Sequence, residues 1–209
     1  MPMPTEELQK RIGYTFRNQA YLERALTHSS FANETGAHNH HLRCNERLEF
    51  LGDSVLSLIA SRYLFARFPD YKEGELSQMR SRIVCEEALC GYAKQFGLGD
   101  FLLLGKGETK SGGAQKPAIL ADAFEAILAA MYLDAGENAL QRVSDFLLPF
   151  LTRAVDEQDG KALLDHKSML YKFIQQDTRE ESLDELEYRL VSAAGPDHAK
   201  TFPMRLDAR

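Results

Sequence analysis

The sequence predicts an all-α domain followed by a smaller, incomplete α+β module. Two long segments, residues 46–68 and 119–133, have helical periodicity and are apolar enough to form the centre of a helical core. After Pro149 a charged stretch leads into one amphipathic segment and two stretches of alternating apolar and polar residues. We therefore expect a helical domain over residues 1–155, a linker over residues 156–164 and an α+β module over residues 165–209.

The first long segment begins with three carboxylates on one helical face. Glu46, Glu49 and Asp53 stand at positions i, i+3 and i+7, so on a helix they form one stripe. The residues that follow, up to Phe65, are apolar almost all round the helix, as in a buried core element. Ionised carboxylates beside such a core need a cation or a proton. Because Arg47 projects elsewhere, we interpret the stripe as part of a site for a divalent metal ion.

A second acidic pair supports this interpretation. Asp122 and Glu125 are the only charged residues between Ile119 and Leu133, again on one face of an apolar helix. Oxygen ligands without Cys or His favour Mg²⁺, for which Mn²⁺ can substitute, over Zn²⁺. A ferritin-like di-iron bundle would need Glu-x-x-His, which neither segment has. The alternative is that these acids are solvated or neutralised by arginines, and their concentration on two apolar helices makes that alternative the weaker one.

Four segments, in order, resemble motifs of the ribonuclease III family. Residues 46–54, Glu-Arg-Leu-Glu-Phe-Leu-Gly-Asp-Ser, are similar to the family signature, and residues 120–126 to its second metal-binding segment. Between them, residues 73–77, Glu-Gly-Glu-Leu-Ser, and 106–113, Lys-Gly-Glu-Thr-Lys-Ser-Gly-Gly, resemble two further motifs. The resemblance covers about Leu8 to Phe150, and four motifs in family order are far more specific than any one of them.

The resemblance implies a helical endonuclease that hydrolyses double-stranded RNA to 5′-phosphate and 3′-hydroxyl ends in rRNA and mRNA processing. It implies that Glu49, Asp53, Asp122 and Glu125 hold the metal ion, with Asp53 and Glu125 as the catalytic pair. By the same resemblance Glu46 and Glu73 are secondary acids, and Glu73 lies at the edge of the catalytic valley, where it helps to place the scissile bond or to hold the metal network. In such an enzyme the carboxylates hold the metal ion and, through it, an activated water and the leaving oxygen.

The resemblance also implies a two-fold homodimer. Phe50 is similar to the aromatic residue that plugs a socket on the partner subunit, and ordinary core packing is the alternative role for it. Two other classes of protein remain open. One is a non-catalytic double-stranded-RNA-binding or assembly protein on a decayed nuclease domain, although decay should erase carboxylates and all of those required are present. The other, a metal-dependent helical hydrolase of nucleotides, is weaker because four family motifs coincide.

Residues 101–117 form the least regular part of the nuclease region. Four glycines stand here among Lys106, Lys110 and Lys116, without the order of a nucleotide P-loop. Exposed backbone N–H groups and lysines can neutralise phosphates, so these three lysines are possible RNA contacts; a mobile surface linker is the alternative. Pro117 departs from the family pattern, but proline suits a first helical turn and the change should cost little.

Shorter elements surround these motifs. We expect helices from Thr5 to near Gly13, from Gln19 to Leu26, and from Glu75 to Phe96 with Gly97 as the C-cap. His28 is more often a packed or hydrogen-bonded residue than a catalytic base. The polar stretch over residues 31–43 contains His38, His40 and His41, which lack a recognisable metal-ligand spacing.

Composition limits the classes of protein to which the chain can belong. The 209 residues allow one or two domains, and a hydrophobic content of 44% is ample for a core. A formal net charge of −6 counts against a protein that simply coats phosphates, but it does not exclude a metal-dependent nuclease. Three cysteines form no CxxC pair and no even set, which is typical of a reducing cytoplasm. The sequence has no apolar leader and no membrane span, so we expect a cytoplasmic protein without membrane contact.

The C-terminal region resembles the opening of a double-stranded-RNA-binding domain. A helix over residues 165–176 is expected, then strands over residues 186–192 and 199–206 around a Gly-Pro-Asp turn. The third strand and the lysine-rich second helix that such a domain uses to grip phosphates do not follow. We therefore expect an incomplete module.

Overall fold

The computed structural model describes residues 4–34, 40–157, 186–190 and 204–208. The chain divides into two compact units, residues 1–158 and 159–209. The described part of the first unit consists of helices and short turns, with one isolated parallel bridge between Thr27 and Leu103. This architecture confirms the prediction of an all-α domain.

The first unit begins with three short helices, α1 (Thr5–Ile12), α2 (Gln19–Ala25) and α3 (Ser29–Glu34), and a 3-10 turn, η1 (His40–Leu42). Gly13 ends α1 in the left-handed conformation, with φ at 66°, which an L side chain rarely adopts. The side chain of Asn18 accepts a hydrogen bond from the Ala20 N–H, at 3.1 Å, and so caps α2.

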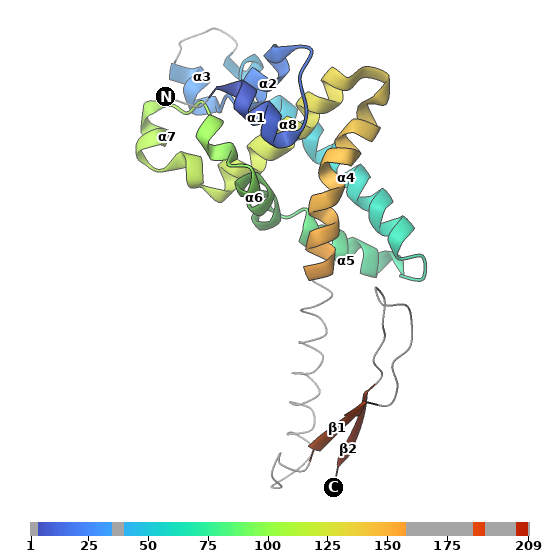
Figure 1. The fold of residues 1–209 in the computed structure, drawn as a ribbon. Helices are drawn as coiled ribbons and strands as arrows, with labels where there is room; N and C mark the ends of the chain where they lie inside the picture. The colour runs from blue at the N-terminus through green and yellow to red at the C-terminus, as the bar shows by residue number, and fades with distance from the viewer. Residues whose placement is uncertain (1–3, 35–39, 158–185, 191–203, 209) are drawn as a thin grey trace. The chain divides into compact units, whose positions relative to one another are not determined.

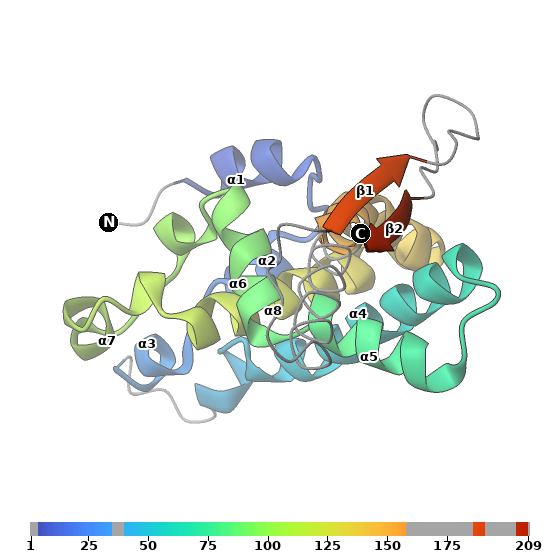
Figure 2. The same ribbon diagram turned by 90° about the horizontal axis from the view of Figure 1, so that it is seen from below.

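Two long helices form the centre of this unit. They are α4 (Glu46–Arg67) and α8 (Pro117–Ala135), the two segments that the sequence singled out. In both views α8 runs through the middle of the helical unit (Figures 1 and 2), and it contacts α2, α4 and α6. Most of its side chains are fully buried, including Phe124, Ile127 and Leu128. Pro117 occupies the first turn of α8, where its missing N–H costs nothing.

The prediction of one continuous helix over residues 75–96 is wrong, because the structure has two helices there. They are α5 (Glu73–Ile83) and α6 (Glu86–Gln95). Cys85 lies in extended backbone, with φ at −73° and ψ at 160°, and precedes α6 as its N-cap. The Tyr92 hydroxyl donates a hydrogen bond to the carbonyl oxygen of Ile83, at 2.9 Å, which satisfies the freed end of α5. Both helices face one core, so apolar periodicity alone cannot reveal the break.

The segment between α6 and α8 contains more helix than expected. It forms the 3-10 turns η2 (Leu98–Phe101) and η3 (Gly113–Gln115), with the short helix α7 (Lys106–Lys110) between them. Gly113 has no room for a side chain, because a Cβ there would lie 2.7 Å from Glu108 Cγ and 2.9 Å from its carbonyl oxygen. The glycines of this stretch therefore serve tight packing as well as turns.

The expectation that α4 is buried on all sides is also wrong. Leu58 and Phe65 are 56% and 74% exposed, and Phe50, on the same side of the helix, is 80% exposed. The opposite side, with Leu56, Ile59 and Leu64, is fully buried. The helix therefore has a core face and a separate apolar stripe, Phe50, Leu58 and Phe65, at the surface.

The first unit ends, within the described residues, in a helix over residues 139–157, which follows the 3-10 turn η4 (Gly136–Asn138). This helix passes two residues beyond the expected boundary at residue 155, and the rest of the expected linker lies outside the described residues. No helix in the described ranges is both long and apolar enough to cross a membrane.

In the second unit the structure describes an antiparallel strand pair. Strands β1 (Leu186–Leu190) and β2 (Met204–Ala208) pair in register from Leu186 opposite Ala208 to Leu190 opposite Met204. Both overlap the expected strands. The helix expected over residues 165–176 lies outside the described residues, so the likeness to a double-stranded-RNA-binding domain stays a prediction.

At Gly52 the backbone of α4 packs directly against that of α8, and this contact can be tested by substitution. A Cβ at Gly52 would run into the carbonyl oxygen and carbon of Glu125. Because both partners are backbone, Gly52→Ala must push the two central helices apart and should lower the free energy of unfolding by about 2 kcal/mol or more. Thermal and denaturant unfolding, followed by circular dichroism, would measure this loss.

Gly91 provides the matched control. It is an exposed residue of α6, and a Cβ there would meet nothing within 4 Å. Gly91→Ala should therefore stabilise the protein, by about 0.5–1 kcal/mol, through helix propensity. Equal effects of the two substitutions would contradict the close packing of α4 on α8.

Candidate metal-binding site on α4 and α8

The predicted metal ligands come from the two central helices where their backbones meet. Glu49 and Asp53 lie one turn apart on α4, on either side of Gly52 in sequence, and Asp122 and Glu125 lie one turn apart on α8. Since Gly52 packs against the backbone of Glu125, the two acidic pairs face the same junction. Glu49, Asp122 and Glu125 are half-buried, and Asp53 is exposed.

Glu125 carries the clearest electrostatic signature of this junction. Burial, and then the negative charges of Asp53, Glu49 and Asp122, raise the pKa of Glu125 from 4.5 to about 8. All three other predicted ligands therefore act on Glu125. In the absence of a cation, this carboxyl group holds a proton at neutral pH.

The other half-buried acids show the same pattern. Burial and the charges of Asp122, Glu46 and Asp53 raise the pKa of Glu49. Burial also raises the pKa of Asp122, partly offset by the positive charge that His28 can carry. All three carboxyl groups are therefore hard to ionise. A single divalent cation at the junction would favour the ionised form of each of them.

The donor set fits a hard divalent cation, but its side chains are not already gathered around one. Among the described residues, no three His, Cys, Asp or Glu side chains are placed to hold a metal ion as they stand. None of the four ion pairs between described residues involves these carboxylates. Oxygen donors, partial burial and the lack of an ion pair to Lys or Arg among the described residues suit Mg²⁺ or Mn²⁺, provided that the side chains reorient on binding.

The two secondary acids lie in different places. Glu46 is exposed at the start of α4, and its charge acts on Glu49, so it belongs to the same junction. Glu73 is the first residue of α5, where its Oε1 accepts a hydrogen bond from Ser77 Oγ at 2.7 Å. It is not among the charges that shift the pKa values of Glu49, Asp122 or Glu125. The structure therefore groups Glu46, but not Glu73, with the four predicted ligands.

The three candidate RNA-contact lysines also differ from one another. Lys116 is paired with Glu108, with 2.6 Å between Nζ and Oε1, and it also donates to Ser111 Oγ at 3.0 Å. The hydrogen bond from Lys116 to Glu108 lowers the pKa of Glu108. Lys106 and Lys110 are exposed at the two ends of α7. Of the three, Lys116 has its charge compensated, and so is the weakest candidate for contact with a phosphate.

His28 is a site residue whose importance the sequence did not show. Its Nδ1 accepts a hydrogen bond from the Ser30 N–H at 3.2 Å, so in the neutral ring the proton lies on Nε2. The Ser30 Oγ lies 2.8 Å from Nδ1 and accepts from the Gly105 N–H at 2.9 Å, which fixes the ring. The charge of His28 acts on both Asp122 and Glu108. The signal in the sequence was the Thr-His-Ser-Ser segment, but its proximity to α8 is non-local.

The histidine cluster at residues 38–41 is described only in part. His38 and the side chain of His40 lie outside the described residues, and His41 is exposed. The expectation of no metal site there stays a prediction.

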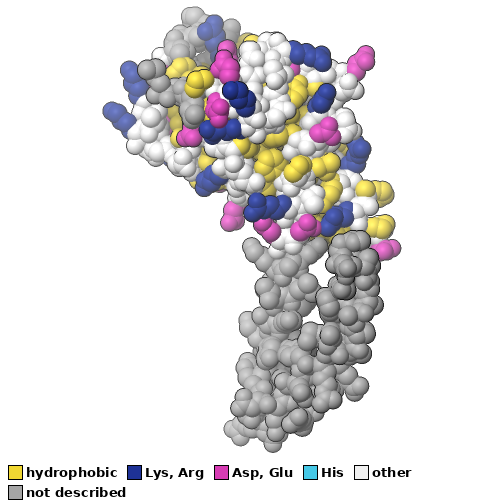
Figure 3. Space-filling view, viewed as in Figure 1, with side chains coloured by type: hydrophobic (Ala, Val, Ile, Leu, Met, Phe, Trp, Pro, Cys, Tyr) yellow, Lys and Arg dark blue, Asp and Glu magenta, His cyan; other side chains and the backbone are white. Residues whose placement is uncertain are grey.

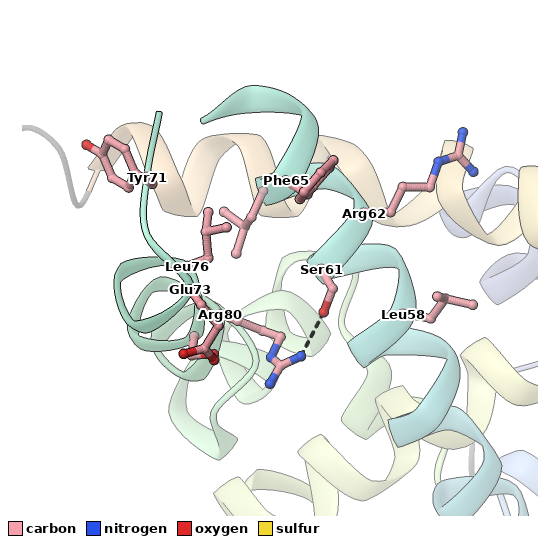
Figure 4. A pocket seen from close by; sticks show the side chains of 10 residues that line it. Leu58, Ser61, Arg62, Phe65, Tyr71, Glu73, Leu76 and Arg80 are labelled. Carbon is pink, nitrogen blue, oxygen red and sulfur yellow. Dashed lines mark hydrogen bonds between the residues drawn. The ribbon is translucent and has the colours of Figure 1, made fainter. Parts of the chain in front are cut away.

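A hollow of about 610 Å³ lies between α4 and α5, apart from the acidic junction. Figure 4 shows Leu58 and Phe65 from α4 and Leu76 and Glu73 from α5 around it, with Tyr71 from the connection between the two helices. Arg80 donates a hydrogen bond to Ser61 Oγ at 2.8 Å and closes one side. In the space-filling view, apolar side chains reach the surface across the middle and the lower right of the helical unit, with basic and acidic groups interspersed among them (Figure 3).

The fold and the junction define a class of protein: an all-helical domain with an acidic centre between two core helices. A family model described as Ribonuclease-III-like matches residues 18–151. "Ribonuclease 3" of Geobacillus kaustophilus is 44% identical over 201 residues, which are 96% of this chain and 78% of the relative. "Ribonuclease 3" of a Roseiflexus species is 42% identical over 209 residues, covering 100% of this chain and 85% of the relative.

A solved structure agrees. The nuclease domain of ribonuclease III from Campylobacter jejuni superposes with a TM-score of 0.65 at 38% identity, covering 72% of this chain and 98% of that one. The chain belongs to the ribonuclease III family, and it is an endoribonuclease of that type. The predicted resemblance and the predicted fold are thereby confirmed.

The pKa of Glu125 predicts how stability depends on pH when metal ions are removed. Between pH 4.5 and about 8 the folded protein retains a proton on Glu125 that the unfolded chain loses. The free energy of unfolding should therefore fall as the pH rises through this window. Glu125→Gln removes this titration. In EDTA, the free energy of unfolding of the variant should therefore rise relative to that of the wild type from pH 5 to pH 8. The gain should reach about 1–2 kcal/mol, because solvent screens part of the interaction at this half-buried residue.

Denaturant titrations at several pH values in EDTA would measure this difference. Glu23→Gln, at an exposed position of α2, should follow the wild type at every pH. A gap between Glu125→Gln and the wild type that stays constant from pH 5 to pH 8 would rule out the raised pKa.

Proposed function

We propose that the protein is a divalent-metal-dependent endoribonuclease that hydrolyses double-stranded RNA to 5′-phosphate and 3′-hydroxyl ends, in rRNA and mRNA processing. The observation that carries the proposal is the convergence of Glu49, Asp53, Asp122 and Glu125 on the junction where Gly52 packs against Glu125. Membership of the ribonuclease III family supports it. Free cysteines at Cys44, Cys85 and Cys90 fit the cytoplasm as the site of action.

The roles of individual residues follow from their positions. The four carboxylates would hold Mg²⁺, or Mn²⁺ in its place, and the ion would polarise the phosphate and lower the pKa of a bound water. Asp53 and Glu125 come from different helices and would orient the phosphate and the water from both sides. Glu125 would release its proton when a cation binds. His28 directs its Nε2–H away from Ser30 and can donate it to a carboxylate or phosphate oxygen nearby.

The surrounding surface suggests how RNA is held. Lys106 and Lys110 are exposed on α7 and can neutralise phosphates beside the junction. Glu46, next to Glu49, would tune the cluster rather than bind the ion directly. The module over residues 165–209, of which the structure describes β1 and β2, would add RNA contacts of its own.

We further propose a two-fold homodimer that uses the exposed stripe of α4. Phe50, Leu58 and Phe65 would be costly to leave in water, and the hollow between α4 and α5 is lined by two of them. In an isologous contact the Phe50 of each subunit can enter the hollow of the other. The Campylobacter jejuni nuclease domain is described as having a region involved in dimer formation, which supports this arrangement.

Cleavage of a long RNA duplex tests the metal assignment. Glu125→Gln and Asp53→Asn each remove the charge that holds a hard cation while keeping side-chain volume, and should lower the rate more than about 100-fold in Mg²⁺. Glu46→Gln should lose less, within about tenfold. The product ends are read by their susceptibility to phosphatase and to ligation.

Metal-dependent thermal shifts and RNA binding in EDTA serve as controls for this assay. Both substituted proteins should stay folded and bind duplex RNA, but lose the thermal shift that Mg²⁺ gives the wild type. Near wild-type turnover in Glu125→Gln or Asp53→Asn would refute the assignment, as would duplex RNA left uncut by the wild type in both Mg²⁺ and Mn²⁺.

The dimer is tested by Phe50→Ala. Loss of an anchoring aromatic in each half of the contact should shift the monomer–dimer equilibrium by roughly 30-fold or more towards monomer, as measured by analytical ultracentrifugation. Tyr132→Ala, which truncates an aromatic residue of α8 that is 36% exposed, should leave the equilibrium unchanged. A wild type that is monomeric at micromolar concentration, or a Phe50→Ala variant that dimerises as well as the wild type, would exclude this interface.

A further inference from the structure

A second polar hollow lies at the opposite end of α8 from the acidic junction. It measures about 220 Å³ and is formed by the loop at residues 13–17 on one side and residues 135–142 on the other. Asp122 and Ala135 are thirteen residues apart on α8, which corresponds to roughly 20 Å of helix. The hollow is therefore separate from the proposed cleavage centre.

Asp134 holds the two sides of this hollow together. Its carboxylate accepts hydrogen bonds from the Tyr14 hydroxyl at 2.9 Å, the Arg17 N–H at 2.9 Å and the Asn18 N–H at 2.8 Å. It is only 7% exposed and does not line the hollow. The loop is thus fixed on α8 by a buried acid whose oxygens already accept these hydrogen bonds, and the positive charge of Arg17 also acts on it.

Two arginines line the hollow from its two sides. Arg17 comes from the loop and Arg142 from the helix over residues 139–157, and both are exposed. Burial and Asp134 raise the pKa of Tyr14 to about 12, and both guanidinium groups lower it, so both lie near that hydroxyl. In the described parts of the chain neither guanidinium forms an ion pair, and no residue that lines the hollow is acidic.

The size and chemistry of the hollow restrict its ligand. A volume of about 220 Å³ is below the roughly 300–1,000 Å³ of sites that enclose drug-sized molecules, so it suits a single small group. Guanidinium forks match the oxygens of a phosphate. Asn138 adds an amide donor, and the helix over residues 139–157 begins beside it with the positive end of its dipole.

We propose that this hollow, between Arg17 and Arg142, binds a phosphate group. The group is supplied either by free inorganic phosphate or by the backbone of an RNA at a distance from the cut. Either source presents the same tetrahedral anion to the two guanidinium groups. The proposal does not depend on the metal site, because the hollow contains none of the carboxylates of the junction.

The first arm of the test uses inorganic phosphate and the whole chain in EDTA, so that no metal ion at the junction can bind the anion. Isothermal titration and thermal shifts at constant ionic strength should show binding by phosphate that chloride does not reproduce. Arg17→Ala combined with Arg142→Ala should weaken this binding about tenfold or more. Arg24→Ala combined with Arg153→Ala, an equal loss of charge at exposed positions elsewhere, should leave it intact.

The second arm measures binding of a short RNA duplex in EDTA as a function of salt. If the RNA backbone supplies the phosphate, the Arg17 and Arg142 double variant should have a salt slope shallower by about one to two than the Arg24 and Arg153 control. An unchanged slope together with lost phosphate binding assigns the hollow to free phosphate.

A wild type that shows no phosphate-specific binding, with identical RNA salt slopes in the two double variants, overturns the proposal. So does phosphate binding that survives in the Arg17 and Arg142 double variant. Neither result bears on cleavage, since both arms are performed without metal ions.

Discussion

The rest of the structure depends on the close approach of α4 and α8 at Gly52. Because Gly52 has no side chain, the two central helices of the described domain can pack backbone against backbone at Glu125. This approach buries one face of α4 and most of α8 in the core, and it brings two acidic pairs that are about seventy residues apart in sequence to one junction. The core and the candidate site therefore have a common origin, and a change that separates these helices affects both.

The junction is a place where function opposes stability. Half-buried carboxyl groups beside one another raise the pKa of Glu49, Asp122 and Glu125, so ionising them without a cation disfavours the folded state. The fully buried side chains of α8, such as Phe124 and Ile127, supply the compensating hydrophobic stabilisation.

Much of this arrangement could be predicted from the sequence, because its causes are local. Helical periodicity and the spacing of the acids predicted α4, α8 and the faces that carry Glu49, Asp53, Asp122 and Glu125. The break at Cys85 could not be predicted, since apolar periodicity continues across it. Nor could the exposure of Phe65, because an apolar pattern does not distinguish a core from an interface. The proximity of His28 to Asp122 arises only from tertiary packing.

The anchor between Asp134 and the loop at residues 14–18 has a consequence for folding during synthesis. The loop and its partner are separated by 116 to 120 residues, and a chain emerges from the ribosome with its N-terminal end first. Helix α2 is therefore made long before α8, the helix against which it packs. Leu8 and Leu22 are fully buried in the finished domain. Both side chains therefore stay exposed to water, or bound to a chaperone, until α8 has left the exit tunnel. Nascent chains that stall before Asp134 will then be especially prone to aggregation.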